Sequence, residues 1–335
     1  MNYTLHTDFS EIPAQAWNTL LKESITDSPF FRYEYQTAWW KHRGGGEWQN
    51  AQLILISASE GDQLAGIAPL FIAEYDGQRA LLLNGSIEIS DYLDVIVRKA
   101  DHAQFISGLF DFLASQLADN WHGLDWYNIP DSSPTLAVIK EESAKRKWTH
   151  HEEVYRPTPR IPLNRTFDEY LATIEKKQRH EIRRKVRRVE ESGRARWFIS
   201  DMQDPEAEVD AFLKLMEDDQ NKAKFLTEPM RAQMRDAIRA AHQGGWLWLA
   251  FLEVDGQRAA AALNFDYNNK MWGYNAGVNR AYMDLSPGWV LLGYILKWCC
   301  DNQRSEFDFM RGDEEYKYRF GAVNQYVMRT KVIKG

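Results

Sequence analysis

The order of the expected elements occurs twice along the 335-residue chain, and this repetition constrains the fold more than any other feature. In each half, three strands joined by tight turns precede a helix and then a short apolar strand. That last strand reads Leu124-Asp125-Trp126-Tyr127 in the first half and Phe307-Asp308-Phe309-Met310 in the second. Short turns between apolar segments are typical of antiparallel strands. We therefore infer an internal duplication of an α/β (α+β) unit.

The two halves are expected to meet at Arg156-Pro157-Thr158-Pro159, which divides the chain into domains 1–158 and 159–335. In the first domain we expect strands at 52–58, 63–74 and 79–83, with turns at Glu60-Gly61-Asp62 and Asp76-Gly77. Further strands are expected at 92–97, 123–129 and 148–155, and helices at 101–117 and 133–147. In the second domain we expect strands at 246–254, 257–267 and 271–277, helices at 204–221 and 286–302, and a last strand at 326–332.

Composition excludes several classes of protein. Hydrophobic residues make up 44% of the chain, with 13 Trp, 15 Tyr and 16 Phe, which is ample for large cores and excludes a disordered chain. The net charge of −7 argues against nucleic-acid binding over the whole surface, although a local basic patch stays open.

The chain is expected to be cytoplasmic. The N-terminal residues lack the basic start and apolar run of a signal peptide, and no apolar stretch is long enough to cross a membrane. The adjacent Cys299 and Cys300 are poorly placed to bridge each other, which fits a reducing compartment. No spacing of Cys and His indicates a metal site, so we expect no metal.

Charged and aromatic residues are concentrated between Glu306 and Phe320. Phe307 and Phe309 alternate with more polar neighbours as in a strand, and Gly312 then breaks it. Polar groups at the end of a buried strand lie where α/β proteins usually bind ligands. A solvated turn with local ion pairs is the alternative.

A second segment, 274–288, joins a strand to a helix. Ser286 is a suitable N-cap, Pro287 suits the first helical position, and Gly288 leaves the helix start uncovered. An uncovered helix N-terminus presents free N–H donors and suits a phosphate or pyrophosphate. The alternative is that Ser-Pro simply begins a helix that binds nothing.

With these two segments the sequence resembles a family. YNAG…LSPGWVLL…FDFMRGDEEYKYRFGA is similar to the C-terminal half of the CelD-like branch of the GNAT acyltransferases, which is related to the Fem-type peptidoglycan aminoacyltransferases. The resemblance covers roughly Lys176 to Ala322 and extends more weakly to Ser90-Asp91-Tyr92-Leu93-Asp94. It implies two tandem GNAT-like domains, each with a mixed, mostly antiparallel sheet flanked by helices.

The resemblance also implies acetyl-CoA or another acyl-CoA as donor and an amine as acceptor. The GNAT loop that cradles the CoA pyrophosphate maps onto 278–288, where Ser286-Pro287-Gly288 stands in place of the usual Gln/Arg-x-x-Gly-x-Gly/Ala. Backbone N–H groups of Asn275, Ala276 and Gly277 would polarise the thioester carbonyl. Ser286 and Gly288 would bind the donor phosphates.

The remaining roles fall on the charged residues. Asp308 or Glu314 is the candidate base that removes a proton from the amine, and Tyr316 would return a proton to the leaving thiolate. Arg311 and Lys317, with Asp313, are candidates for holding phosphate or an acidic substrate group. The motif residues Asp91, Tyr92 and Asp94 are further candidates for substrate binding. A structural ion pair is the alternative for Asp308 and Arg311.

A basic helix is expected over 176–189. Ile182, Val186 and Val189 share one face, and basic residues, including the candidate ligands Arg179 and Arg183, occupy the rest. Such a helix suggests an anionic partner: tRNA, an anionic lipid head group or a nucleotide-sugar. A solvated helix facing acidic residues such as 217–219 is the alternative.

We therefore predict an acyl-CoA-dependent N-acyltransferase acting on a small-molecule, cell-envelope or exopolysaccharide precursor. One alternative is a Fem-like enzyme using aminoacyl-tRNA, although the helices between Asp204 and His242 are too short for the coiled-coil arm of the tRNA-using relatives. The other is a non-catalytic GNAT-like module that binds an anionic ligand. Peripheral membrane contact stays open, and the sequence makes no prediction of oligomeric state.

Overall fold

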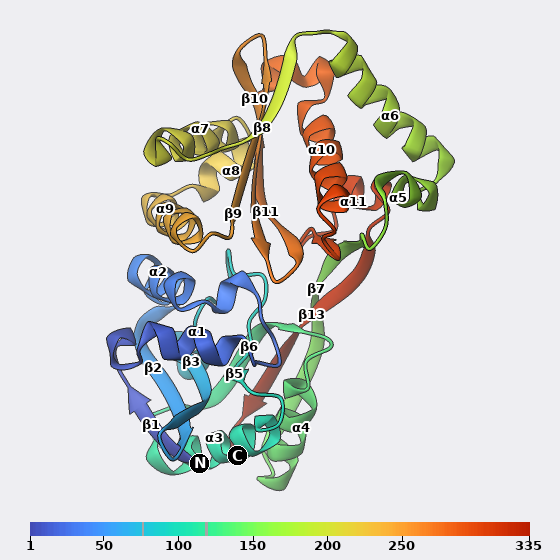
Figure 1. Ribbon diagram of the computed structural model, residues 1–335. Helices are drawn as coiled ribbons and strands as arrows, with labels where there is room; N and C mark the ends of the chain where they lie inside the picture. The colour runs from blue at the N-terminus through green and yellow to red at the C-terminus, as the bar shows by residue number, and fades with distance from the viewer. Residues whose placement is uncertain (76, 118–119) are drawn as a thin grey trace. The chain divides into compact units, whose positions relative to one another are not determined.

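The structure is a computed structural model that describes residues 1–75, 77–117 and 120–335 (Figure 1). The chain forms two compact units, Met1–Pro157 with Tyr326–Gly335, and Thr158–Gln325. The last ten residues, which the sequence analysis placed in the second domain, therefore group with the first unit. The turn expected at Asp76 lies outside the described residues.

The first unit contains a mixed sheet in the strand order β1-β2-β3-β4-β6-β13, and β5 pairs with β3. β4 and β6 are parallel, and the other neighbours pair antiparallel. The elements of this unit are β1 (Asn2–His6), α1 (Ala14–Leu21), α2 (Tyr33–Arg43), β2 (Gln49–Glu60), β3 (Gln63–Tyr75), β4 (Gln78–Leu83), β5 (Ile96–Val97), α3 (His102–Gln116), β6 (Gly123–Pro130), α4 (Thr135–Lys145) and β13 (Val323–Ile333), with short 3-10 turns at Phe9–Glu11 and Pro29–Phe31.

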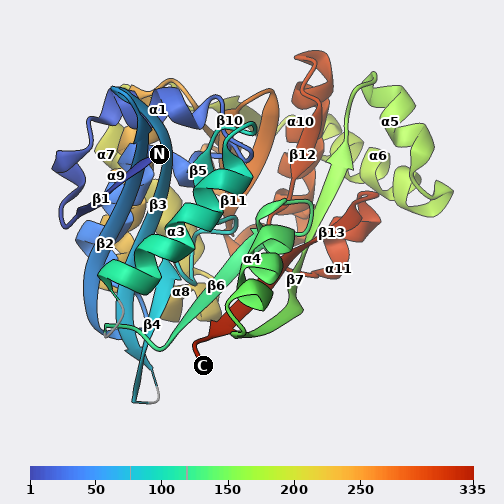
Figure 2. The same ribbon diagram turned by 90° about the horizontal axis from the view of Figure 1, so that it is seen from below.

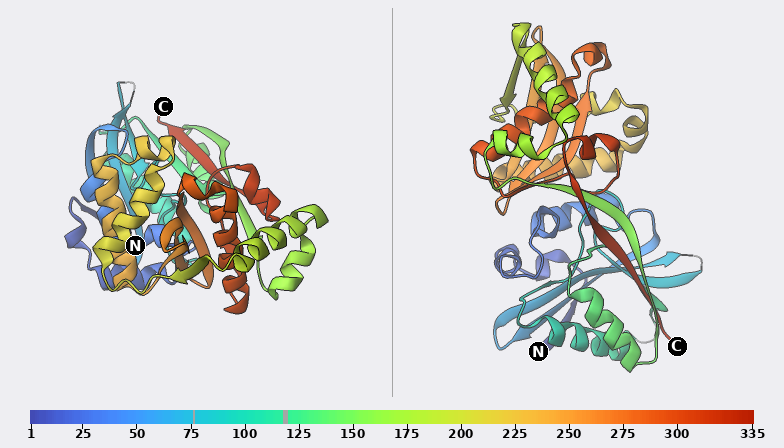
Figure 3. Two further views of the ribbon diagram at one scale, coloured as in Figure 1. Left: turned by 90° about the horizontal axis from the view of Figure 1, so that it is seen from above. Right: turned by 90° about the vertical axis from the view of Figure 1, so that its right-hand side faces the viewer.

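Helices cover both faces of this sheet because successive residues of its strands are apolar. Leu70 and Ile72 of β3 belong to the core cluster that contains the apolar face of α3. Phe71, between them, points to the other face and contacts Trp39 of α2 at 5.8 Å between ring centroids. Figures 2 and 3 show α3 and α4 on one face of the strands and α1 and α2 on the other.

The second unit repeats this plan with the strand order β8-β9-β10-β11-β12-β7. β11 and β12 are parallel, and the other neighbours pair antiparallel. The elements are β7 (Thr149–Pro162, which begins in the first unit), α5 (Phe167–Thr173), α6 (Lys176–Glu191), β8 (Ala195–Ile199), α7 (Pro205–Glu217), α8 (Gln220–Phe225), α9 (Glu228–Gln243), β9 (Leu247–Val254), β10 (Gln257–Tyr267), β11 (Lys270–Val278), η3 (Arg280–Leu285), α10 (Pro287–Asp301), β12 (Glu306–Asp308) and α11 (Glu315–Arg319).

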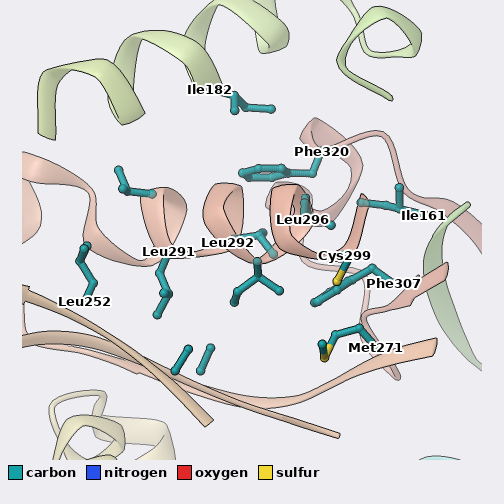
Figure 4. Close-up of a cluster of buried hydrophobic side chains, with 14 of the residues drawn as sticks. Ile161, Ile182, Leu252, Met271, Leu291, Leu292, Leu296, Cys299, Phe307 and Phe320 are labelled. Carbon is teal, nitrogen blue, oxygen red and sulfur yellow. The ribbon is translucent and has the colours of Figure 1, made fainter. Parts of the chain in front are cut away.

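The core of the second unit is organised around α10, most of whose residues are buried. Leu291 and Leu296 of this helix lie between the sheet, which contributes Leu252 and Met271, and Ile182 of α6 (Figure 4). Figure 1 shows α7 and α9 on the opposite face of the same strands. Full burial of one such side chain stabilises the fold by about 1.5–3 kcal/mol. The helices on the two faces of the sheet therefore stabilise it by burying its apolar side chains.

The expected duplication is visible in the order of elements. In each unit a three-stranded meander leads to a long helix, α3 or α10, and then to a strand parallel to the end of the meander. The fold class expected from the sequence, a mostly antiparallel mixed sheet flanked by helices in each unit, is confirmed.

Several boundaries differ from the predictions. β7 continues through Arg156–Pro159 without a break, and the strand expected at 92–97 shrinks to Ile96–Val97. The helix expected over 204–221 is divided, because the Asp219 carboxylate accepts the N–H groups of Asn221 and Lys222 and so begins α8.

No helix in the described part of the chain combines the length and the apolar character needed to span a lipid bilayer.

Candidate active site

The strands β11 and β12 separate halfway along β11. They pair only from Lys270 to Trp272, because β12 ends at Asp308 and Met310 and Gly312 then adopt positive φ angles of 57° and 116°. A bulge between the pairs Leu263–Asn275 and Asn264–Gly273 bends β11 just beyond this point. Beyond Trp272 the edge of β11 is therefore not paired with β12, and Ala276 is exposed there.

Two polar side chains cover the backbone of Ala276. The Lys222 ammonium of α8 donates to the Asn275 Oδ1 at 3.1 Å and to the Ala276 carbonyl at 2.5 Å. The same Asn275 oxygen accepts the Ala276 N–H at 3.1 Å. Sequence reasoning selected Asn275 and Ala276 but missed Lys222, whose local sequence carries no signal and which only tertiary folding brings to β11.

Gly277 is required by packing. A Cβ at this position would lie 2.5 Å from the Leu215 carbonyl carbon and 2.6 Å from the Met216 nitrogen, both in the backbone of α7. The sequence analysis assigned Gly277 to the donor site, but its glycine character is explained by the close approach of α7.

Lys317 organises the loop that follows β12. Its ammonium donates to the carbonyl groups of Arg311 and Gly312 at 3.0 and 3.1 Å and pairs with Glu314 Oε2 at 2.9 Å. The residue is only 3% exposed. Its three donors are therefore used inside the protein, and the role expected for Lys317 in binding substrate is replaced by a role in holding Glu314.

The Glu314 carboxylate is accessible and ionised at neutral pH. Its side chain is 59% exposed. Partial burial acts to raise the pKa of Glu314, but the hydrogen bond and charge of Lys317, together with the charge of Lys222, outweigh it and lower the pKa. Glu314 also lies over Gly312, where a Cβ would approach its Oε2 to 2.5 Å.

Tyr316 lies beside this carboxylate and contacts Phe309 edge-on at 5.9 Å between centroids. Desolvation and then the Glu314 charge raise the pKa of the Tyr316 phenol above its usual range, so it stays protonated at neutral pH. Asp313 is exposed and Arg311 half-buried in the same loop.

Asp308 is a buried ion-pair partner. It is fully buried, accepts the Met310 N–H at 2.7 Å and pairs with Arg160 at 3.2 Å. Of the two carboxylates that the sequence offered as base, only Glu314 is therefore open to a substrate.

The start of α10 lies beside the ends of β11 and α11. A Cβ at Gly288 would meet Val278 Cγ1 at 2.9 Å, and the Trp289 ring lies 4.5 Å from that of Phe320. Ser286 occupies the N-cap position as expected, but in a left-handed conformation with φ 53°, and within the described residues its hydroxyl caps no N–H group of α10.

The basic helix is confirmed as α6, with Ile182 and Val189 buried against the core. Arg179 donates to the carbonyl groups of Leu171 and Ala172 at 3.5 and 3.4 Å, and Arg183 pairs with Asp168 at 3.1 Å. These contacts join α5 to α6. Arg183 also lines a cavity of about 210 Å³ between α6 and α10, formed with residues that include Ile182, Val186, Gly293 and Tyr294.

The first-unit candidates lie mostly inside the protein. Tyr92 is buried, and Asp94 accepts hydrogen bonds from Ser133 Oγ at 2.5 Å, Thr135 Oγ1 at 2.6 Å and the Val95 N–H at 2.8 Å. Asp94 therefore anchors the start of α4, and of the three candidates only Asp91 is partly exposed.

The structure thus brings Lys222 to Asn275 and Ala276, to both of which its ammonium donates hydrogen bonds. The charges of Glu314 and Lys317 also act on the pKa of Lys222. Arg179, Arg183, Tyr92 and Asp94 make their contacts elsewhere. Across residues 1–75, 77–117 and 120–335, no group of three or more His, Cys, Asp or Glu side chains is arranged to hold a metal ion.

Comparison with known proteins relates the part of the chain that contains these residues to a family. Residues 176–318 match the profile of the acetyltransferase (GNAT) domain family. A search of curated proteins finds no match to the chain.

Among solved structures, FemX is similar with a TM-score of 0.69 and 13% identity, over 98% of this chain and 97% of FemX. The C-terminal domain of a protein assigned as a lysylphosphatidylglycerol synthetase from Agrobacterium fabrum gives a TM-score of 0.61 and 11% identity, over 98% and 93%. A tandem GNAT protein from the clavulanic acid biosynthesis pathway gives a TM-score of 0.51 and 12% identity, over 98% of this chain and 97% of that protein.

These similarities establish a shared fold along nearly the whole chain, and the family match covers the unit that contains Lys222, Asn275 and Glu314. Residues 176–318 therefore carry an acetyltransferase (GNAT) domain, and the whole chain shares its fold with FemX and with the tandem GNAT protein.

Proposed function

We propose that the protein transfers an acyl group from acyl-CoA to an amine at the open edge of β11. The observation that carries this proposal is the separation of β11 from β12, which leaves Ala276 exposed. Lys222, which donates to the Ala276 carbonyl, also lowers the pKa of the ionised Glu314 by its charge. An exposed strand edge offers N–H and C=O groups that pair with an extended amide-containing ligand, such as the pantetheine arm of CoA.

The residues supply three functions in this reaction. The Glu314 carboxylate attracts the acceptor's ammonium group, whose ordinary pKa is ~10.4, and takes its proton. The Ala276 N–H, released from Asn275, polarises the acyl carbonyl as negative charge develops on its oxygen. The protonated Tyr316 lies next to Glu314 and orients the acceptor by hydrogen bonding.

We further propose a cell-envelope or exopolysaccharide precursor as the acceptor, on the basis of the fold shared with FemX. The same similarity supports a second candidate donor, aminoacyl-tRNA. The short α7, α8 and α9, of 13, 6 and 16 residues, favour CoA, because they form no extended arm. A GNAT-like module that binds CoA without turnover is the third candidate.

The test is an assay of thiol release and amide formation. Thermal-shift screening with CoA thioesters of graded length selects the donor, and a panel of amines then identifies the acceptor class. Glu314→Gln should lower kcat/KM by ~10²-fold or more, the range typical of a lost general base.

The matched control is Glu315→Gln, one residue further on, because Glu315 is exposed and pairs with Arg319 at 2.6 Å. It should retain the wild-type rate. Product formed from aminoacyl-tRNA but not from any CoA thioester would show that aminoacyl-tRNA, and not acyl-CoA, is the donor. CoA binding without turnover would establish the non-catalytic alternative.

A further inference from the structure

Lys222 is held at the centre of the site by a chain of contacts that begins at Gly277. The missing side chain at Gly277 lets the α7 backbone approach β11, and α8 begins three residues after α7 ends. The Asp219 carboxylate fixes the first turn of α8 by accepting the N–H groups of Asn221 and Lys222 at 2.9 and 3.1 Å. This placement carries the Lys222 ammonium to the open edge of β11.

The surroundings of this ammonium are unlike those of a surface lysine. It donates hydrogen bonds to Asn275 Oδ1 and the Ala276 carbonyl, on the strand edge where the proposed donor would lie. The charges of three groups act on its pKa: Asp219, the N-cap of its own helix, and Glu314 and Lys317 from the segment around α11. It therefore lies between the acyl-binding edge and the proposed base.

We propose that Lys222 is the proton donor to the departing sulfur of the acyl-CoA, a role that rests on the function proposed above. Binding of the donor along β11 displaces the ammonium from Ala276 and leaves it beside the thioester. The acceptor nitrogen forms a bond to the carbonyl carbon, and the C=O π pair moves to oxygen. When the C=O re-forms, the C–S bond breaks, its electron pair stays on sulfur, and sulfur takes a proton from Lys222.

The proton balance closes through Glu314. The acceptor nitrogen loses two protons: Glu314 takes the first from the ammonium group and passes it to water before attack, and then takes the second from the nitrogen of the adduct. The neutral Lys222 amine takes this second proton back from Glu314, which leaves both residues as they began. The net reaction is thioester plus amine giving amide plus thiol.

Acid strengths favour Lys222 over Tyr316 in this role. Desolvation lowers the pKa of Lys222 against the opposing effect of Asp219 and Glu314, and Lys317 lowers it further. The pKa of Lys222 therefore moves toward the ~8.5 of a thiol, whereas the pKa of Tyr316 is raised away from that value. Proton transfer is efficient between groups of matched pKa.

The experiment measures the single-turnover rate of acyl transfer in Lys222→Met, Lys222→Arg and the control Lys224→Met. Lys224 is exposed on the same short helix. Lys222→Met should lower the rate by ~10²-fold or more, with the KM for the acceptor changed less than about threefold. Lys222→Arg should be as slow as Lys222→Met, because a guanidinium keeps its positive charge but does not release its proton. Lys224→Met should match wild type.

The pH profile supplies a readout that a structural role would not change. In wild type the rate should fall at alkaline pH as Lys222 loses its proton, with a midpoint below the ~10.4 of an ordinary lysine. Wild-type rates in Lys222→Arg, or a wild-type profile without this alkaline limb, would overturn the proton-donor role and leave the proposed function standing. No thiol release by the wild-type protein from any thioester overturns the proposed function and this role together.

Discussion

Gly277 shows how one absent side chain decides where the functional groups lie. It was selected from the sequence for a site role, yet its nearest neighbours are backbone atoms of Leu215 and Met216. Its consequence for the site is indirect, because it sets the distance between β11 and the helix that leads to Lys222.

We predict that Gly277→Ala destabilises the protein by about 1–3 kcal/mol, since the new methyl group must displace the α7 backbone. Urea denaturation measures the change. The comparison variant is Gly293→Ala in α10, where the nearest atom is Val186 Cγ2 at 3.3 Å and alanine favours the helix. Equal losses in both variants would contradict the packing argument.

The buried pair of Asp308 and Arg160 gives a second prediction at this scale. Asp308→Asn removes the carboxylate from a cation that remains largely buried, so we expect a loss of about 3–5 kcal/mol. Asp313→Asn, in the exposed part of the same loop, should change stability by less than about 0.5 kcal/mol. An unfolding midpoint unchanged in Asp308→Asn would show that the pair does not hold β12.

Residues differ in how far the sequence reveals their roles. Glu314 and Asn275 were selected as candidates from the sequence because they lie at expected strand ends, near a glycine or a turn. Lys222 was missed because nothing within Gln220–Phe225 distinguishes it from Lys224; only the position of α8 does. Asp308 and Lys317 were found as chemistry-bearing residues, but burial, which local sequence does not report, gives them structural roles.

At the scale of elements, the start of α4 is joined to the segment before β5 by one carboxylate. Burial raises the pKa of Asp94 from 3.8 to about 6, against the opposing hydrogen bonds of Ser133 and Thr135. The folded protein therefore holds a proton at Asp94 more tightly than the unfolded chain does. This favours the fold below about pH 4, and the contribution is lost as the pH rises through about 6.

We predict that Asp94→Asn removes this pH dependence, because the amide does not ionise. The free energy of unfolding, measured by urea at steps between pH 4 and 7, should fall in wild type relative to the variant by about 2 kcal/mol across that interval. Curves that stay parallel throughout would mean that Asp94 is not buried as described.

Elements were predicted well where periodicity was strong and poorly where tertiary contacts set the ends. The meanders, α3 and α10 follow the alternation and helical spacing of their apolar residues. β7 runs on past Arg156–Pro159 and pairs with β12 at Arg160–Pro162; no local pattern encodes this continuation, since proline ordinarily ends a strand.

At the scale of the molecule, the first unit is completed by the end of the chain. β13 pairs antiparallel with β6 from Val327–Pro130 to Ile333–Gly123, and Val327, Thr330 and Val332 are fully buried. The order of elements indicated the duplication from the sequence alone. The pairing of β13 with β6 of the first unit was not predicted, because the pattern of a strand does not show which strand it pairs with.

We predict that removing residues 326–335 destabilises the first unit selectively, by more than about 3 kcal/mol from the two buried valines alone. Hydrogen exchange should show loss of protection in β4 and β6, while β9, β10 and β11 remain protected. Loss confined to residues 158–325 would contradict the assignment of β13 to the first unit.

The position of β13 at residues 323–333 also determines when the first unit can complete its sheet during synthesis. When residues 1–157 have left the ribosome, β6 is still without its antiparallel neighbour, and it stays so until residues 326–333 emerge. The later-made unit holds all of its own strands before the earlier-made one does. A nascent chain of this protein therefore carries an open apolar sheet edge while residues 158–325 are made, and that edge is the natural target for a chaperone.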